Sequence, residues 1–524
     1  MDIFLQYCIK RKEMNRMAKY KTKTLKVNGK TYNGSNSTTI IDKVSVYGKK
    51  NTVKALKGND IITIYKGSAH KIYGGDGKDT ISIGKNAGEK IYVDGGKGND
   101  KIIITGGGSW SNHKIHGGAG NDTIIVSKGN SVMRSYIYGE AGDDTITVNG
   151  GAQHKIYGGT GADTIILVGS GGDTVYTGGS SGKNYDRVYI GTAYDSSATV
   201  TGSKQKDYIA VNGGYGHKIS TGAGNDVIKI GSDKIVVKGS RSVIKTGTGN
   251  DSVTAINATG GFTVETGEGN DVITVNKSKS AVIRPGTGTN TIKISNTTSA
   301  HIYSSGETAL NKITISGGKW NHVDTNNYSK TGTKNQVTIN SGTNHTVHGT
   351  PGKDVTTVNG GSGHVIYVGC GNNVGDTVTV NGGKNITLNL AGNTSNNVAH
   401  IKGGSTKVEL NKNSTDTIHI YSSSKQNSIE ITYHGDRQCI GDKADYNNWH
   451  VLGDSSKKCI ILHDNFYERP KYYSDSNGGT LVMGTGNNTL TINGYGYVKD
   501  VLQFGEVSGS GNIRPLQSLY IIKA

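Results

Sequence analysis

Gly74-Gly75-Asp76-Gly77-Lys78-Asp79-Thr80-Ile81-Ser82-Ile83 is a stretch that the sequence repeats with small changes. Related copies begin at Gly95, Gly117, Gly139 and Gly158, at spacings of 21, 22, 22 and 19 residues. Weaker copies begin at Lys57, Thr221, Thr246 and Thr266, and a copy at Pro285 has Asn290 in place of the aspartate. An internal period of about 20 residues is typical of a solenoid, in which each repeat forms one coil.

Each repeat contains two short stretches with the pattern of a β-strand. In Thr80-Ile81-Ser82-Ile83 polar and apolar residues alternate, as expected of a strand buried on one face. A second stretch, such as His70-Lys71-Ile72-Tyr73, comes just before the glycine pair. Two strands per coil with no helical pattern between them predict an all-β fold. We expect a parallel β-roll or β-solenoid of about 18–20 coils, degenerate toward the C-terminus.

The composition excludes several other classes of protein. The 524 residues include 80 glycines but only 4 prolines, and glycine does not recur at every third position, which excludes collagen. Recurrent Ile and Val argue against simple disorder, and no apolar run is long enough for a membrane-spanning helix. The cysteines are too few and too scattered for a disulfide scaffold, and whether Cys439 pairs with Cys459 stays open.

The repeated stretch resembles the nonapeptide G-G-x-G-x-D-x-U-x of the RTX (repeats-in-toxin, haemolysin-type calcium-binding) proteins. Full matches stand at Gly74, Gly95, Gly117 and Gly158, and near matches at Gly139, Thr221, Thr246 and Thr266. The resemblance covers roughly residues 55–295 and implies a parallel β-roll loaded with Ca²⁺. It also implies an extracellular or cell-surface protein, exported through an uncleaved C-terminal signal by type I secretion.

The chemistry of the turn favours the same cation. Glycines allow left-handed backbone angles that point carbonyl oxygens into a tight turn, and each turn adds one carboxylate. Oxygen ligands without a soft donor suit Ca²⁺. Stacked coils would align the carboxylates about 4.8 Å apart, where each pair repels by about 1–3.5 kcal/mol unless a cation lies between them. The candidate calcium ligands are Gly58, Asp60, Gly75, Gly77, Asp79, Gly96, Gly98, Asp100, Gly118, Gly120, Asp122, Gly142, Asp144, Gly159, Gly161, Asp163, Gly222, Gly224, Asp226, Gly247, Gly249, Asp251, Gly267, Gly269 and Asp271.

The alternative is that these Asp and Asn side chains only cap turns, and we favour it beyond Asn290, where the column of carboxylates loses its charge. The chain also departs from the family in two ways. The turn on the other edge of each coil is variable, which predicts one column of metal sites instead of two. The net charge of +18 is unusual for a mostly acidic family and predicts a graded dependence on calcium.

The outward positions of the second strand suggest another binding function. We expect one ladder of lysines and a parallel ladder of mainly aromatic side chains, which together would bind an acidic glycan or envelope polymer. The lysines are Lys71, Lys90, Lys114, Lys155 and Lys218, and the aromatic ladder is Tyr73, Tyr92, His116, Tyr138, Tyr157 and Tyr176. Nucleic acid is not an expected partner, because no nucleic-acid-binding motif accompanies the charge. His70, His113 and His154 fall on alternate coils, with Glu89 and Ser135 between them, and are expected to form hydrogen bonds at turn ends.

The order of patterns predicts five regions. Residues 1–20 form a leader or cap, 21–300 the regular calcium-binding roll, and 301–424 a degenerate continuation of it. Residues 425–475 form an irregular insertion or cap, and 476–524 the last coil and a C-terminal segment that is a candidate secretion signal. We expect a monomer without enzymatic activity. A β-helical polysaccharide lyase or epimerase would need carboxylates and bases clustered in one groove, and the sequence pattern shows no such cluster.

Overall fold

The computed structural model describes residues 19–434 apart from short gaps, and six strands beyond them. The gaps are residues 27, 109, 129–131, 180–184, 192–196, 239–240, 305–308, 325–333, 351, 369–374, 391–396, 412–416 and 422–427. Residues 1–18, which include most of the expected leader, lie outside the described residues, as do all four cysteines and much of the expected insertion. The chain divides into two units, Met1–Ser252 and Val253–Ala524.

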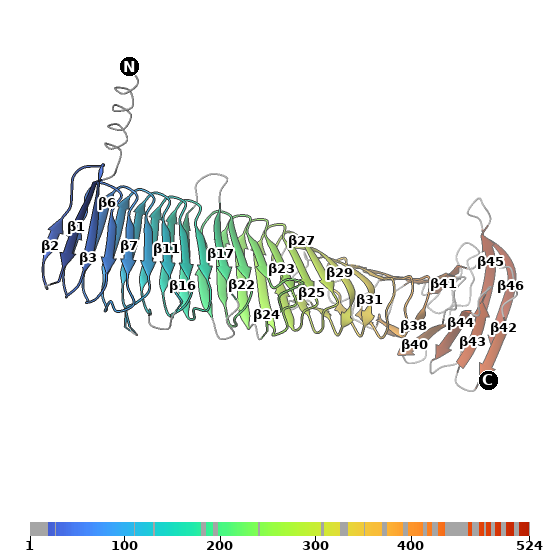
Figure 1. The fold of residues 1–524 in the computed structure, drawn as a ribbon. Coiled ribbons are helices and arrows are strands. Elements are labelled where there is room, and N and C mark those ends of the chain that lie inside the picture. The colour runs from blue at the N-terminus through green and yellow to red at the C-terminus, as the bar shows by residue number, and fades with distance from the viewer. Residues whose placement is uncertain are drawn as a thin grey trace, which may run out of the picture. The chain divides into compact units, whose positions relative to one another are not determined.

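The first unit consists of two parallel sheets, and each coil contributes one strand to each sheet (Figure 1). The first sheet contains β1 (Lys19–Leu25), β3 (Ile40–Val46), β5 (Ile61–Ile64), β7 (Thr80–Ile83), β9 (Lys101–Ile104), β11 (Thr123–Val126), β13 (Thr145–Val148), β15 (Thr164–Leu167), β17 (Asp186–Ile190), β19 (Asp207–Val211) and β21 (Val227–Ile230). The second contains β2 (Thr31–Asn33), β4 (Thr52–Lys54), β6 (Lys71–Asp76), β8 (Tyr92–Lys97), β10 (Lys114–Ala119), β12 (Tyr136–Ala141), β14 (Lys155–Thr160), β16 (Asp173–Gly179), β18 (Ala198–Thr201), β20 (Lys218–Ala223) and β22 (Ser242–Thr248).

The second unit repeats this arrangement up to residue 434, and β41 beyond it adds one more parallel strand to the first sheet. Its odd-numbered strands are β23 (Ser252–Ile256), β25 (Val272–Asn276), β27 (Thr289–Ser295), β29 (Leu310–Lys319), β31 (Lys334–Thr343), β33 (Val355–Val358), β35 (Thr377–Val380), β37 (Val398–Ile401), β39 (Thr417–Tyr421) and β41 (Ile460–His463). Its even-numbered strands are β24 (Phe262–Glu268), β26 (Ala281–Arg284), β28 (His301–Tyr303), β30 (His322–Asp324), β32 (Thr346–His348), β34 (Val365–Tyr367), β36 (Ile386–Asn389), β38 (Ser405–Asn411) and β40 (Ser428–His434).

The last described strands are mostly antiparallel. β44 (Asn488–Asn493) pairs in parallel with β40, but β43 (Gly478–Met483) lies antiparallel between β44 and β42 (Lys471–Asp475). β45 (Lys499–Val507) and β46 (Ile513–Ile522) form a separate antiparallel pair.

The parallel solenoid has about 17 turns of about 21 residues, slightly fewer than predicted, and the described residues form no helix. Within the described part of the chain there is accordingly no helix that could cross a membrane.

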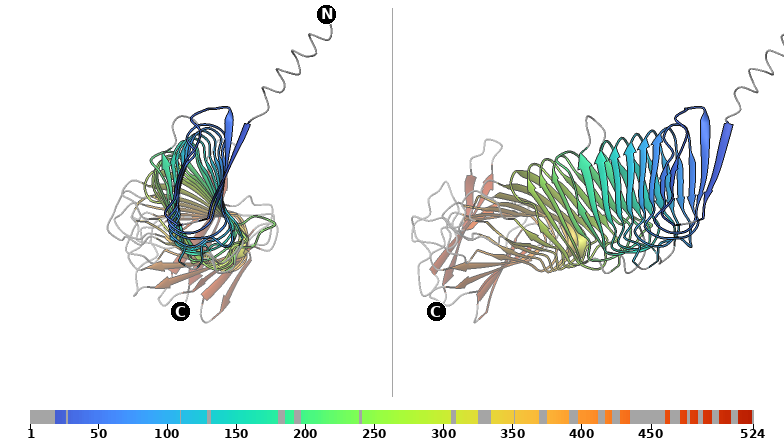
Figure 2. Two further views of the ribbon diagram at one scale, coloured as in Figure 1. Left: turned by 60° about the vertical axis from the view of Figure 1, so that its left-hand side comes forward. Right: turned by 90° about the vertical axis from the view of Figure 1, so that its left-hand side faces the viewer.

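The core lies between the two sheets, whose strands face each other when the coils are viewed nearly end-on (Figure 2). Ile81 and Ile83 of β7 point inward and are fully buried, as the alternating sequence predicted. Ile72 of β6 faces them from the second sheet and pairs in register with Val93 of the next coil. Each such side chain contributes roughly 1.5–3 kcal/mol by leaving water. Repeating this stack from coil to coil fixes the register and brings equivalent turn residues into columns.

Candidate metal centre

The turn between an even-numbered strand and the next odd-numbered strand is built on glycines. Gly75, near the end of β6, and Gly77, just after it, have φ angles of 109° and 143°, which L side chains rarely adopt. A Cβ atom on Gly75 would lie 1.9 Å from the carbonyl oxygen of Leu56, and one on Gly77 would lie 1.9 Å from that of Gly58. The turn therefore excludes side chains both by its backbone angle and by contact with the preceding coil. Positive φ angles occur at the other predicted turn glycines as well: Gly58, Gly96, Gly98, Gly118, Gly120, Gly142, Gly159, Gly161, Gly222, Gly224, Gly247, Gly249, Gly267 and Gly269.

The aspartate that ends each turn points into the molecule and lies directly above its equivalent in the preceding coil. The backbone N–H of Asp60 donates to Oδ1 of Asp79 at 2.6 Å, and that of Asp79 donates to Oδ1 of Asp100 at 2.7 Å. The same bond repeats through the next coils, and these side chains are at most 2% exposed. We call this set the aspartate column: Asp60, Asp79, Asp100, Asp122, Asp144 and Asp163.

The second carboxylate oxygen of each member of the aspartate column is buried and has no hydrogen-bond partner among the residues that the structure describes. In every member except Asp60, it lies close to the first glycine of its own turn, and a carbonyl oxygen of the following coil lies close to the same glycine. A Cβ atom on Gly74 would lie 2.4 Å from both Oδ2 of Asp79 and the carbonyl oxygen of Gly95. Gly139 repeats this arrangement with Asp144 and the carbonyl oxygen of Gly158. A buried oxygen without a partner costs about 1–3 kcal/mol, and more when it is charged.

Burial disfavours the charged form of the aspartate column. It raises the pKa of Asp79 and of Asp144 from an ordinary 3.8 to about 8, against the opposing effect of the backbone N–H bonds. Neighbouring carboxylates of the column raise these two pKa values further. The pKa of Asp122 rises to about 7, and those of Asp60, Asp100 and Asp163 rise to about 6, again mainly through burial.

These residues fit a hard divalent cation. The side-chain and carbonyl groups that could ligate a metal at these turns are oxygens. Each coil of the aspartate column supplies one carboxylate oxygen without a hydrogen-bond partner among the described residues, together with backbone carbonyls. Ca²⁺ takes 6–8 such oxygens in flexible geometry, whereas softer metals prefer imidazole or thiolate. The unpartnered carboxylate oxygens and the turn carbonyls are the groups that would hold the ion. A bound cation would give each of these carboxylate oxygens a partner and would offset the repulsion between neighbouring carboxylates of the column.

The column of polar residues extends beyond the predicted ligands. Asp186 continues it after Asp163, whose backbone N–H donates to Oδ1 of Asp186 at 2.8 Å. Asp226 and Asp251 make the same contact with each other at 2.8 Å. The buried Asp42, Asp186 and Asp207 are not among the predicted ligands, because their turns lack the repeated glycine phrase. The detectable signal is an aspartate two residues before the first apolar residue of an alternating stretch, as in Asp186-Arg187-Val188-Tyr189-Ile190.

In the second unit asparagines occupy the same position. Asp271 donates its backbone N–H to Oδ1 of Asn290 at 3.0 Å, and Nδ2 of Asn290 donates to Oδ1 of Asn311 at 3.2 Å. Nδ2 of Asn311 then donates to Oδ1 of Asn335 at 3.2 Å. The loss of charge expected from Asn290 onward is therefore real over these coils, but Asp354 and Asp376 restore carboxylates later.

An exposed ladder that the sequence analysis did not identify lies beside the aspartate column. Asn99 accepts a bond from the backbone N–H of Asn121 at 2.9 Å, and Asn121 accepts one from that of Asp143 at 2.9 Å. Asn59 does the same for Lys78 at 2.8 Å. These side chains join successive turns at the surface, so turn capping and a buried carboxylate column coexist at neighbouring positions.

The opposite edge of the coils carries buried histidines that act as hydrogen-bonding bridges, as predicted. Nδ1 of His113 accepts the backbone N–H of Ile91 at 3.2 Å, while its Nε2 lies 3.2 Å from the carbonyl oxygen of Gly106. Burial lowers the pKa of His113 and of His154 to about 4, so both rings are neutral at pH 7. Ile91, rather than Glu89, occupies the coil between His70 and His113.

The ladders on the outer face differ from the prediction in one coil. Lys71 pairs with Tyr92, and Tyr73 pairs with Asp94, so Lys90 is not part of the lysine ladder. Tyr92 was predicted in the aromatic ladder but occupies the lysine position, from which its ring still contacts Tyr73 and His116. The lysine ladder consists of Lys71, Lys114, Lys155 and Lys218, and other residues separate each from the next. The prediction aligned Lys90 by its Lys-Ile-Tyr context, but the register is set by the glycine pair, which Lys90 precedes by five residues and Lys71 by three.

The aromatic side chains form a stack along the coils. Tyr138 and Tyr157 have ring centroids 4.7 Å apart with planes at 9°, and Tyr157 and Tyr176 are 4.8 Å apart at 9°. His116 stacks on Tyr138 at 4.6 Å. The ring faces therefore cover one another along this stack, and the ring edges remain to face outward.

Raising the pH should destabilise the metal-free protein. When the pKa of a group is higher in the folded than in the unfolded state, the folded protein keeps a proton that the unfolded chain has released. The free energy of unfolding is therefore highest at low pH and falls as the pH rises through the pKa of the folded state. Between pH 6.5 and 8.5 the carboxylates of Asp79, Asp122 and Asp144 ionise, whereas the buried histidines, with lowered pKa values, stay neutral. We expect the Tm in EDTA to fall by about 5 °C or more across this interval, measured by circular dichroism. A flat or rising Tm would contradict ionisation within the aspartate column.

The comparison with protein families bears on these turns directly. Residues 71–85, 114–133 and 134–152 match the family model of the RTX calcium-binding nonapeptide repeat, which counts four copies. No curated protein matches the chain. The matched residues include the turns that hold Asp79, Asp122 and Asp144, where the glycine geometry and the buried carboxylates are found. The chain therefore contains RTX calcium-binding nonapeptide repeats.

Proposed function

We propose that this protein is a secreted or cell-surface β-roll that binds Ca²⁺ between its coils, and that Ca²⁺ stabilises its fold. One observation carries the proposal: the aspartate column holds buried carboxylate oxygens without hydrogen-bond partners, in register from coil to coil. Extracellular calcium modules bind with dissociation constants of about 10⁻⁴–10⁻³ M, so a site of this kind fills outside the cell and stays empty at low intracellular concentrations. Under this proposal the protein would be stabilised by calcium only after it has left the cell.

The dependence on calcium should be graded. Without metal, one oxygen of each column carboxylate still accepts a backbone N–H, and the Ile and Val stacks still bury apolar surface. In the second unit the Asn290–Asn311–Asn335 ladder has no charge to neutralise. Metal-free protein should therefore retain structure around the asparagine ladder and lose it mainly around the aspartate column.

A calcium titration followed by circular dichroism tests the proposal. Millimolar Ca²⁺ is about a tenfold excess over a Kd of about 10⁻⁴ M, and at that excess each bound ion adds about 1.4 kcal/mol. Several sites together should therefore raise the Tm of the full chain by about 10 °C or more. Mg²⁺ at the same concentration is the control, because it demands near-octahedral geometry and dehydrates reluctantly. If millimolar Ca²⁺ changed neither the β signal nor the Tm beyond the effect of Mg²⁺, the proposal would be wrong.

Absence of enzymatic activity belongs to the same proposal. The carboxylates of the aspartate column are at most 2% exposed and point into the coil, where a polysaccharide does not reach them. This arrangement supports a structural cation and gives no support to a lyase or epimerase mechanism in the column.

Binding of an acidic glycan by the outer face is the second candidate, and the geometry favours only part of it. Lys114 and Lys155 are exposed and lie two coils apart, about 9.6 Å, so ion pairing with a polyanion is available. Stacking of sugars is less supported, because the faces of Tyr138 and Tyr157 are covered by neighbouring rings. We therefore place calcium binding first.

A further inference from the structure

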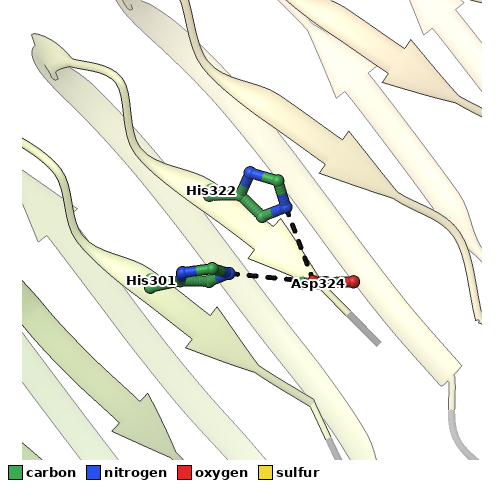
Figure 3. Close-up of side chains that lie close together, drawn as sticks. All are labelled: His301, His322 and Asp324. Carbon is green, nitrogen blue, oxygen red and sulfur yellow. Dashed lines mark ion pairs between the residues drawn. The ribbon is translucent and has the colours of Figure 1, made fainter. Parts of the chain in front are cut away.

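A cluster of metal-ligating side chains lies in the second unit, apart from the turns. His301 of β28 and His322 of β30 are paired in register on adjacent parallel strands, and Tyr303 pairs with Asp324. Ile302 and Val323 between them are buried in the core, so the flanking side chains lie on the outer face. Figure 3 shows both imidazole rings and the carboxylate directed toward one another.

The ligand atoms are already close together. Oδ2 of Asp324 is 3.8 Å from Nε2 of His301 and 3.7 Å from Nε2 of His322. One ligand atom from each of the three residues lies within 4.8 Å of the other two. Zn–N and Zn–O bonds of 2.0–2.2 Å in a tetrahedral site place ligand atoms about 3.3–3.5 Å apart. Small rotations of these side chains would therefore complete the geometry.

The two nitrogens that would ligate the metal are buried. Neither Nε2 of His301 nor Nε2 of His322 has a hydrogen-bond partner among the described residues. Nδ1 of His301 lies 3.3 Å from the hydroxyl of Tyr303; as an N–H donor to that oxygen it would leave the lone pair on Nε2. A buried imidazole nitrogen without a partner is costly, and a metal ion would satisfy both.

The charge state also suits a metal. Burial lowers the pKa of His322, and the neighbouring His301 and His348 lower it further, against the opposing charge of Asp324, so the neutral ring that ligates metals predominates at pH 7. His348 packs against His322 with ring centroids 5.0 Å apart and holds that ring in place. Imidazole nitrogen is a ligand of Zn²⁺, Cu²⁺ and Ni²⁺ and not of Ca²⁺, which takes oxygen ligands.

We propose that His301, His322 and Asp324 form a binding site for a late first-row divalent metal ion, represented by Zn²⁺, separate from the calcium column. Three protein ligands leave one position of a tetrahedral ion open to water or to a ligand group from a partner. The site lies on the outer face, where its side chains are 27–35% exposed, so an ion reaches it without unfolding the coil.

Zinc titration of the full-length chain in saturating Ca²⁺ tests the site, with Co²⁺ as a spectroscopic substitute. The double variant His301→Ala/His322→Ala should lose one tight Zn²⁺ equivalent and the visible absorption of four-coordinate Co²⁺. Asp324→Asn, which keeps the side-chain shape, should weaken Zn²⁺ by more than about 10-fold, the lower end of what loss of an outer-shell partner costs.

The matched control is His116→Ala, because His116 also lies on an outer sheet face and is paired with a carboxylate. Its Nδ1 is 2.6 Å from Oε1 of Glu140, but within the described part of the chain no further metal-ligating side chain completes a cluster with this pair. This variant should keep the tight Zn²⁺ equivalent, and circular dichroism in Ca²⁺ should show that all variants are folded. Equal zinc stoichiometry and affinity in the wild type and the double variant would overturn the proposal, and so would an equal loss in the control.

Discussion

Replacing Asp79, Asp100 and Asp122 together by asparagine is expected to remove much of the response to calcium while stabilising the metal-free protein. Asparagine keeps the Oδ1 acceptor that the preceding backbone N–H uses at 2.7 Å in Asp100 and in Asp122. It carries no charge, so the cost of ionising a buried column disappears. We expect the Tm in EDTA at pH 8 to rise by about 5–10 °C and the further gain on adding Ca²⁺ to shrink by at least half.

The second unit shows that such a ladder is sterically feasible. Nδ2 of Asn290 donates to Oδ1 of Asn311, and Nδ2 of Asn311 donates to Oδ1 of Asn335, each at 3.2 Å, at the equivalent position of the coil. In the triple variant each new amide would find either the next Oδ1 or the nearby glycine carbonyl of the following coil. The substitution therefore exchanges a cation-dependent column for one that satisfies its own hydrogen bonds.

The control removes the same number of charges from exposed positions. Asp76→Asn/Asp143→Asn/Asp233→Asn changes three exposed aspartates of the same unit and leaves the buried column intact. This variant should keep both the EDTA Tm and the calcium response within about 2 °C of the wild type, since exposed charges contribute little. If the column variant kept the full calcium response, or the surface control lost it, the buried carboxylates would not be the ligands that couple Ca²⁺ to stability.

The glycine spacing was sufficient to predict the fold, because it fixes where each coil turns. Gly75 pairs with Gly96 and Gly96 with Gly118, at the spacing read from the repeated phrase. The error at Lys90 has a physical reason: the turn on the other edge varies in length from coil to coil. Strand positions must therefore be counted back from the glycine pair, and counting forward from the preceding strand misplaces them.

The candidate sites were predictable only where a residue and its turn share a motif. Asp79 could be predicted because the glycines of the motif precede it, whereas Asp186 follows a turn without these glycines and was not predicted. His301 and Asp324 belong to different coils and share no local motif, so only the register of β28 with β30 reveals that they meet. Contacts between coils depend on pairing, which a single repeat does not encode.

Gly178→Ala is expected to cause a large loss of stability, with or without calcium. Gly178 pairs with Gly159 of the preceding coil and has a φ of 106°. A Cβ atom there would lie 2.0 Å from the carbonyl oxygen of Gly159, which belongs to the sheet backbone and has little freedom to move. The strained angle and the clash together should cost at least about 3–5 kcal/mol, or about 10 °C in the Tm of the first unit.

The adjacent glycine provides the matched control. Gly179 has no positive φ, and a Cβ atom on it would meet nothing within 4 Å, so Gly179→Ala should leave the Tm unchanged or raise it slightly. Amide hydrogen exchange should show lost protection in β14 and β16 of the Gly178 variant only, because each coil contacts mainly its neighbours. Similar Tm values for the two variants would show that the turn backbone tolerates a side chain. That result would contradict the close approach of successive coils on which the alignment of the aspartate column depends. The result does not depend on metal, so it tests the scaffold separately from the ion that we propose it binds.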